Sequence, residues 1–281
     1  MKNKKNTKRN IVLNILIIIF TITFAFSVYK LWEINNNYAE EAKIHEEVLE
    51  FKPEDDNVWE FVPPPSPPAT SETGQEPPED WVPPVVNPSI LDMQNNVNSD
   101  VVGWINIPGT QVDYPFVKKE PEDKNDFYLH RDVYKKYLFA GTLFMDYRCS
   151  RDFSVFNTII YGHNMKNGSM FGTLKNFKDK KFFDGYKMAK IYLPNETYLL
   201  EIFAYVLTTD RDSTIYGTIS ASGEESVTQY IDYVKDKATH YRELNITSND
   251  KIITLSTCTN GAENERIVIL ARIVTQQNSV G

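Results

Sequence analysis

The sequence of 281 residues contains little cysteine, histidine and glycine, and these shortages exclude several classes of protein. Its two cysteines, Cys149 and Cys258, are too few for a disulfide-stapled scaffold, although a single bridge between them is an open alternative. No CxxC pair or Cys/His cluster suggests a metal site, so we expect no metal. The 12 glycines exclude a collagen-like chain, and the net charge of −8 argues against a nucleic-acid partner.

The charge is distributed unevenly along the chain. Residues 1–9 carry five cations and no acid, whereas residues 38–80 contain 13 acids and only two lysines. Residues 89–281 are nearly neutral. This asymmetry indicates a basic tail, an acidic connecting segment and an ordinary globular domain.

Residues 11–28 form an apolar run of 18 residues without a charged side chain. As a helix this run rises ~27 Å, close to the ~30 Å hydrocarbon core of a bilayer. Because cations precede it and acids follow it, we expect residues 1–10 to be a cytoplasmic tail and residues 11–28 a single-pass anchor. The protein would then sit in the cell membrane with the rest of the chain, residues 29–281, extracellular. A cleaved signal peptide, with Ala25-Phe26-Ser27 as its cleavage site, is the alternative.

Residues 29–88 are expected to form an extracellular stalk. Residues 38–51 have the pattern of a short acidic helix. Residues 53–88 hold 11 of the 15 prolines, so this part favours extended polyproline II over helix or sheet.

Residues 89–281 have the pattern of a mainly β domain. A short helix is predicted to begin at Ser89 with Ile90, Leu91 and Val97 buried, and a longer one spans residues 224–241, before the strand that contains Cys258. The remaining pattern is short strands without regular βα alternation, which favours a closed barrel over a doubly wound fold. The predicted strands cover residues 101–107, 115–117, 141–147, 157–163, 189–194, 198–207, 251–258 and 265–274.

Three residues are candidates for catalysis, although each has a simpler structural interpretation. Cys258 ends the apolar strand ITLSTC before a turn, where a thiol on a rigid support is accessible. His163 ends the strand NTIIYGH, a position suited to a general acid or base. Arg266 opens the last apolar strand. Taken singly, these residues are compatible with a buried cysteine, a structural histidine and a solvated arginine.

Together the three residues match a family. The segment TLSTC followed by Arg266 resembles the TLxTC…R signature of sortases, and YGHN resembles their catalytic-histidine strand. The resemblance runs from about residue 101 to residue 275. NTIIYGHNMKNGSMFGTLKNF, the leading helix and the long insertion before the cysteine strand are similar to class B sortases in particular.

This resemblance implies a membrane-anchored cysteine transpeptidase of a Gram-positive cell, an enzyme that needs no cofactor. Cys258 would attack the Thr–Xaa bond of an NPxTx-like C-terminal sorting motif on a secreted protein. His163 would transfer protons and Arg266 would hold the oxyanion. A cell-wall amine on a peptidoglycan precursor would then resolve the thioester.

The resemblance also suggests three substrate-binding residues. Ser256 lies two residues before Cys258 and so shares its strand face. Asn125 and Leu129 correspond to family positions that grip the proline end of the motif, and the insertion over residues 208–250 would form another wall. Three alternatives stay open: a pilin-polymerising sortase, a hydrolytic cysteine peptidase, and an inactive surface-displayed binding module.

Overall fold

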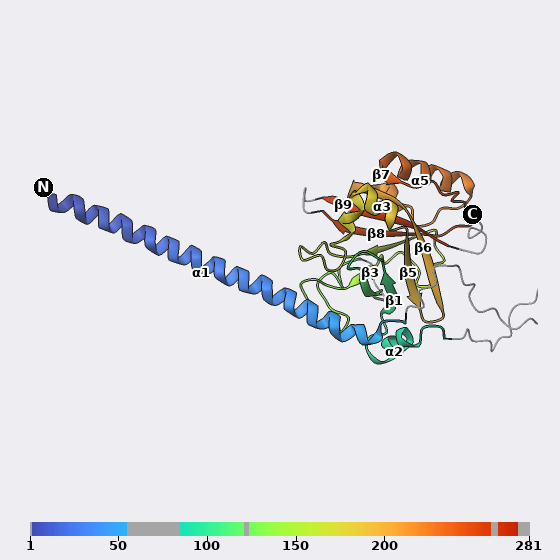
Figure 1. The fold of residues 1–281 in the computed structure, drawn as a ribbon, viewed down its shortest axis with the longest axis horizontal. Helices are drawn as coiled ribbons and strands as arrows, with labels where there is room; N and C mark the ends of the chain where they lie inside the picture. The colour runs from blue at the N-terminus through green and yellow to red at the C-terminus, as the bar shows by residue number, and fades with distance from the viewer. Residues whose placement is uncertain (1, 55–84, 121–123, 260–263, 275–281) are drawn as a thin grey trace, which may run out of the picture. The chain divides into compact units, whose positions relative to one another are not determined.

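The computed structural model describes residues 2–54, 85–120, 124–259 and 264–274 (Figure 1). The chain divides into two compact units, residues 1–44 and residues 45–281, and each is described by itself. The proline-rich stretch predicted to adopt polyproline II falls mostly on residues 55–84, outside the described residues.

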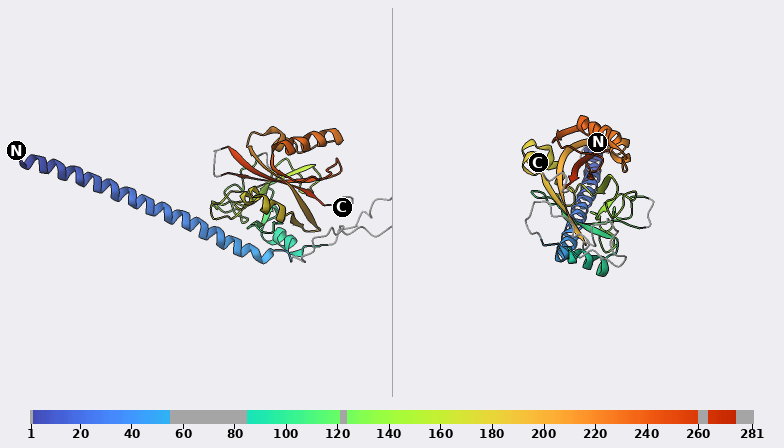
Figure 2. Two further views of the ribbon diagram at one scale, coloured as in Figure 1. Left: turned by 45° about the horizontal axis from the view of Figure 1, so that its top comes forward. Right: turned by 90° about the vertical axis from the view of Figure 1, so that its right-hand side faces the viewer.

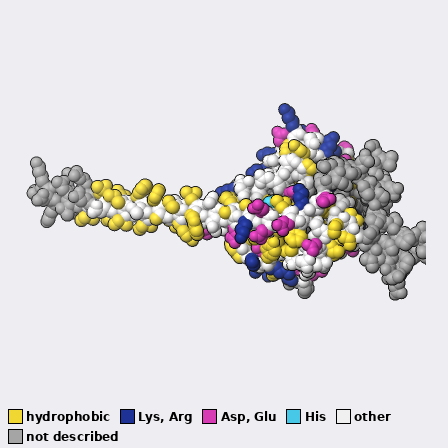
Figure 3. Space-filling view, turned by 60° about the horizontal axis from the view of Figure 1, so that its bottom comes forward, with side chains coloured by type: hydrophobic (Ala, Val, Ile, Leu, Met, Phe, Trp, Pro, Cys, Tyr) yellow, Lys and Arg dark blue, Asp and Glu magenta, His cyan; other side chains and the backbone are white. Residues whose placement is uncertain are grey.

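The first unit is formed by helix α1 (Lys2–Val48), whose last residues belong to the second unit. Its most apolar 18-residue window has a mean hydropathy of 2.6 and is not buried. Figure 3 shows hydrophobic side chains along this helix, in the region of the predicted span. The helix is long and apolar enough to cross a membrane, a requirement that signal sequences also meet. The short acidic helix predicted at residues 38–51 is not separate, since α1 runs on to Val48 and is followed by η1 (Leu49–Phe51).

The second unit is built on short strands, with helices at its start and in its connections (Figure 1). The helices are α2 (Pro88–Asn96), η2 (Leu174–Lys178), α3 (Lys180–Gly185), α4 (Ser213–Gly217) and α5 (Glu224–Lys237). The strands are β1 (Val101–Asn106), β2 (Asp113–Val117), β3 (Leu143–Met145), β4 (Asn157–Tyr161), β5 (Met188–Leu193), β6 (Glu196–Thr209), β7 (Ala238–Tyr241), β8 (Ile252–Cys258) and β9 (Glu265–Ile273).

Eight of these strands close into a barrel, and Figure 2 shows the ribbon from further sides. The order is β5-β1-β2-β3-β4-β8-β9-β6, and β6 pairs back to β5. The β2–β3 and β4–β8 pairs are parallel, and the other pairs are antiparallel. Closure gives each of these eight strands a neighbour on both sides, and the short strand β7 is added to β6. The predicted closed, mainly β barrel is therefore confirmed.

The helix predicted in the long insertion is present, but it is shorter than predicted. α5 buries Val227, Tyr230 and Val234 against barrel residues that include Phe203 of β6. The helix ends at Lys237, and residues 238–241 form β7 along β6. The prediction to residue 241 was wrong because Ala238 continues the helical spacing by coincidence, while the edge of β6 offers backbone partners to an extended chain.

The N-terminal side of the barrel is covered by α2 and by the end of the preceding helix. Ile90 and Met93 of α2 are fully buried and pack in one cluster with Val48 and Trp104. The predicted helix near Ser89 is confirmed, but Leu91 and Val97, both expected to be buried, are only partly buried, and Met93 is buried instead. The domain boundary expected at residue 89 stays a prediction, and Val48, which lies within the unit of residues 45–281, already belongs to this cluster.

Gly103 permits close approach of two barrel strands. A Cβ atom at this position would lie 2.4 Å from the backbone carbonyl oxygen of Tyr192, on the neighbouring strand β5. Because that carbonyl belongs to a paired strand, it has little freedom to move.

We therefore expect Gly103→Ala to lower the free energy of unfolding by about 1–3 kcal/mol. Thermal unfolding of the full-length chain in detergent, followed by near-ultraviolet circular dichroism, measures the change. Gly185→Ala is the matched control, since a methyl group added there would meet no described atom within 4 Å. Equal unfolding temperatures for the two variants would contradict the explanation.

Candidate active site

Two strand pairings bring the candidate residues to one end of the barrel. In the parallel β4–β8 pair, Tyr161 lies opposite Ser256, and Gly162 N–H donates to the Ser256 carbonyl at 3.2 Å. Continuing this register by two residues sets His163 level with Cys258. In the antiparallel β8–β9 pair, Cys258 lies opposite Arg266, and directly opposed residues project their side chains on the same face.

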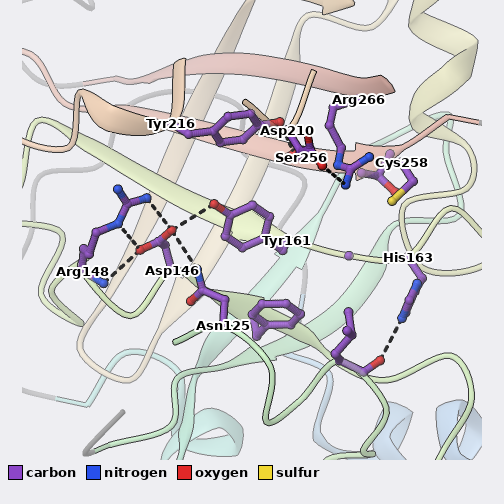
Figure 4. A pocket seen from close by; sticks show the side chains of 14 residues that line it. Asn125, Asp146, Arg148, Tyr161, His163, Asp210, Tyr216, Ser256, Cys258 and Arg266 are labelled. Atoms are coloured by element: carbon purple, nitrogen blue, oxygen red, sulfur yellow. Dashed lines mark hydrogen bonds and ion pairs between the residues drawn. The ribbon is translucent and has the colours of Figure 1, made fainter. Parts of the chain in front are cut away.

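These residues line a pocket of about 380 Å³ (Figure 4). The pocket contains all six residues predicted from the sequence, and it adds others that the sequence did not indicate. Its lining consists of Asn125, Leu129, Phe144, Asp146, Arg148, Tyr161, Gly162, His163, Asp210, Tyr216, Ser256, Thr257, Cys258 and Arg266. The shared pocket is an observation, whereas the roles assigned to the six residues stay predictions.

The two cysteines differ sharply in their surroundings. Both are free thiols, so the disulfide alternative is not what the structure shows. Cys258 is exposed at the end of β8. Cys149 lies in the loop between β3 and β4 but is only 2% exposed, and its sulfur accepts from the Ile159 N–H at 3.4 Å. Burial raises the pKa of the Cys149 thiol to about 11, which leaves Cys258 as the accessible nucleophile of the pair.

The His163 imidazole is held by the loop that follows β2. Its Nε2 lies 2.8 Å from the Leu129 carbonyl oxygen, and because a carbonyl only accepts, Nε2 carries a proton (Figure 4). The ring also stacks on His130, with centroids 5.2 Å apart and planes inclined by 23°. Burial, together with His130, lowers the pKa of His163, while the Leu129 carbonyl opposes this shift. The imidazole is therefore mostly neutral at pH 7.

Contacts at the pocket rim orient Arg266. Its Nη1 donates to the Glu265 carbonyl at 3.1 Å, and its Nη2 lies 3.4 Å from Oδ2 of Asp210. Asp210 belongs to the turn between β6 and α4, inside the insertion over residues 208–250. No sequence signal distinguished Asp210, because its partner lies 56 positions away in the chain.

A tyrosine wall faces Ser256. The Tyr216 hydroxyl and Ser256 Oγ are 2.8 Å apart, and the Tyr216 ring stacks on Tyr161 with centroids 6.3 Å apart. Burial raises the pKa of Tyr216 to about 12, so its hydroxyl stays protonated and can donate. Ser256 itself is 2% exposed, in agreement with a position facing the pocket interior.

Asp146 gathers the polar groups on the opposite side of the pocket. Its buried carboxylate accepts hydrogen bonds from Asn125 Nδ2 (2.9 Å), Arg148 Nε (2.8 Å) and Nη2 (2.7 Å), and the Tyr161 hydroxyl (2.9 Å). Burial alone would raise the pKa of Asp146, but the hydrogen bonds from Arg148 and Tyr161 hold it below its usual value. The hydrogen bond from Asn125 to Asp146 occupies the side-chain amide of Asn125. In this structure Asn125 therefore stabilises the loop that carries Leu129.

Among the residues that the structure describes, no group of three or more His, Cys, Asp or Glu side chains is placed to hold a metal ion. The pocket lining supplies a thiol, an imidazole, two guanidinium groups, two carboxylates, an amide, and the hydroxyls of tyrosine, serine and threonine.

Comparison with known proteins identifies similar chains. A family model for the sortase domain matches residues 105–274. The chain is 36% identical over 194 residues to sortase B of Listeria monocytogenes, covering 68% of this chain and 76% of that protein. It is 31% identical over 180 residues to sortase B of Staphylococcus aureus, covering 63% and 72%.

Solved structures agree with the sequence matches. The crystal structure of sortase B from Bacillus anthracis in complex with AAEK1 superposes with a TM-score of 0.65 at 31% identity, covering 85% of this chain and 99% of that chain. Sortase B of Clostridium perfringens gives a TM-score of 0.60 at 32% identity, covering 66% and 99%.

We expect iodoacetamide to alkylate Cys258 much faster than Cys149 at pH 8. With a pKa of about 11, Cys149 is a thiolate in about one molecule in a thousand at that pH, and it is buried as well. Peptide mapping by mass spectrometry gives both rates, with Cys258→Ala as the control. Comparable rates at the two thiols would contradict the assignment of Cys258 as the accessible one.

We expect His130→Ala to raise the pKa of His163, because the substitution uncovers the imidazole and removes a neighbour that lowers this pKa. The pKa is measured from the pH dependence of the His163 Cε1–H chemical shift. His240→Ala is the control, since His240 packs against Phe183 and Tyr205 instead. An unchanged or lower pKa of His163 in His130→Ala would show that the stack has no such effect.

Proposed function

Because this chain belongs to the sortase family and is a class B cysteine transpeptidase, we propose that it anchors secreted proteins to the cell wall of a Gram-positive cell. Its substrates would carry a C-terminal NPxTx-like sorting motif, cleaved between threonine and the next residue. The observation that carries this proposal is the convergence of an exposed Cys258, His163 and Arg266 on one pocket.

The first half-reaction forms a thioester on Cys258. The thiol proton passes to the neutral imidazole of His163 as the sulfur attacks the threonine carbonyl carbon. Arg266, a permanent cation opposite Cys258, stabilises the negative charge that develops on the carbonyl oxygen. The C–N bond then breaks, His163 gives its proton to the leaving amine, and the acyl group remains on sulfur.

The second half-reaction transfers the acyl group to an amine of a peptidoglycan precursor. The amine nitrogen attacks the thioester carbon, its proton passes through His163 to the departing sulfur, and a new amide forms. Water in place of the amine gives hydrolysis. Leu129, Asn125 and Ser256 are proposed to contact the motif, with Tyr161 and Tyr216 supplying apolar surface beside them.

The apolar part of α1 is proposed to span the membrane once, with the five cations of residues 1–9 on the cytoplasmic side and the catalytic domain outside. Exported substrates are held in the same membrane before they are sorted. Tethering enzyme and substrate to one surface raises their effective concentration without any new contact.

The test uses the full-length chain in detergent micelles with quenched NPxTx and LPxTG peptides, with and without an oligoglycine acceptor. We expect cleavage of the NPxTx peptide and an amine-linked product, both absent from Cys258→Ala and retained by Cys149→Ala. Arg266→Ala is expected to lower kcat by about 10²–10³-fold, in line with the loss of an oxyanion-stabilising donor.

Other outcomes separate the alternatives. Release of free acid alone in the presence of oligoglycine would favour a hydrolase or an acceptor of another kind, such as a pilin lysine. No cleavage of either peptide, combined with slow alkylation of Cys258, would refute the enzyme and favour a binding module.

A further inference from the structure

Asp212 lies just outside the pocket but receives hydrogen bonds from three different elements. Its Oδ2 accepts from the hydroxyls of Thr208 on β6 (2.5 Å) and Tyr233 on α5 (3.0 Å). Its Oδ1 accepts from the backbone N–H groups of Thr214 (3.1 Å) and Ile215 (3.0 Å), at the start of α4. One carboxylate thus joins the barrel, the insertion helix and the short helix between them.

The short helix α4 carries a wall of the pocket. Its five residues include Tyr216, whose hydroxyl contacts Ser256 and whose ring stacks on Tyr161. A single helical turn is not stable alone, so its orientation depends on outside restraints. Ile215, fully buried among residues of β6 and α5, supplies one restraint, and Asp212 at the N-cap supplies another.

The partners of Asp212 are fixed independently of it. Thr208 pairs with Arg266 in the β6–β9 ladder, which continues along nearly the whole of β9. Tyr233 belongs to α5, which is held by the buried side chains of Val227, Tyr230 and Val234. The restraint therefore runs from the barrel and α5 through Asp212 to α4.

We propose that Asp212 is a positioning residue for the peptide substrate, holding α4 so that Tyr216 stays against Ser256. The inference rests on the proposed function, because the peptide is the ligand that this wall would contact. Asp212 acts through Tyr216 and does not itself touch the reacting atoms. Its loss should weaken peptide binding and leave the chemistry at Cys258 unchanged.

The expected effect of Asp212→Ala is a rise of about 10-fold in the KM for the motif peptide, the size expected from losing a helix cap. We expect kcat to stay within about twofold of wild type, because the lost restraint affects peptide binding equally in the ground state and the transition state. Asp212→Asn keeps an Oδ1 acceptor for the helix cap, so its KM should stay close to that of wild type. Tyr233→Phe removes one hydrogen bond and should shift KM in the same direction by less.

The matched control is Asp179→Ala. Asp179 is also an N-cap, accepting from the Phe182 N–H at 3.0 Å, but its helix α3 contributes no residue to the pocket. A loss of general stability would affect both aspartate variants, whereas positioning of Tyr216 raises KM only in Asp212→Ala.

A second readout needs no turnover. Hydrogen–deuterium exchange of the full-length chain should show faster exchange of the α4 amides, including Tyr216 N–H, in Asp212→Ala, with α5 unchanged. If wild type cleaves neither peptide, the proposed function fails, and exchange still decides whether Asp212 positions Tyr216. An unchanged KM with unchanged α4 exchange, or an equal rise of KM in Asp179→Ala, would overturn the inference.

Discussion

The site depends above all on the parallel pairing of β4 with β8. Parallel strands bring their carboxyl ends to the same edge of a sheet, so two segments about 95 positions apart present their last residues side by side. The register of Tyr161 with Ser256 sets His163 level with Cys258. A slip of one residue would turn one of these side chains to the other face of the barrel wall.

The polar groups around this edge form two clusters, one around Asp146 and one around Arg266 and Ser256. The buried carboxylate of Asp146 accepts hydrogen bonds from Asn125, Tyr161 and Arg148 and so holds these side chains in place. Across the pocket, Asp210 contacts Arg266, and Tyr216 contacts Ser256. Side chains held by such bonds lose little freedom when a ligand arrives, which favours a preorganised site.

The sequence predicted the strands best where burial made them apolar throughout. β8 and β9 are buried along most of their length, and this pattern located Cys258 and Arg266 at the strand ends. It failed for β7, whose four residues continue the spacing of α5 and become a strand only because β6 has a free edge there. Cys149 lies among polar neighbours in the sequence, yet its thiol is buried and accepts a hydrogen bond from Ile159 of β4.

Tyr216, Asp210 and Asp146 had no signal in the sequence, since the pocket residues that they join, Ser256, Arg266 and Asn125, lie far from them along the chain. The Tyr216 contact with Ser256 joins residues 40 positions apart, and the Asn125 contact with Asp146 joins residues 21 apart. Such contacts follow from closure of the barrel and from the path of the insertion. Local composition and periodicity carry no information about either.

The central claim is that this geometry makes Cys258 the residue that carries the acyl group. Intact-mass spectrometry of the full-length chain, quenched shortly after mixing with an NPxTx peptide and without acceptor, tests it directly. The account predicts an adduct that ends at the motif threonine, maps to Cys258 and is released by hydroxylamine. An adduct on Cys149, or turnover with no adduct at Cys258 under any quench, would contradict it.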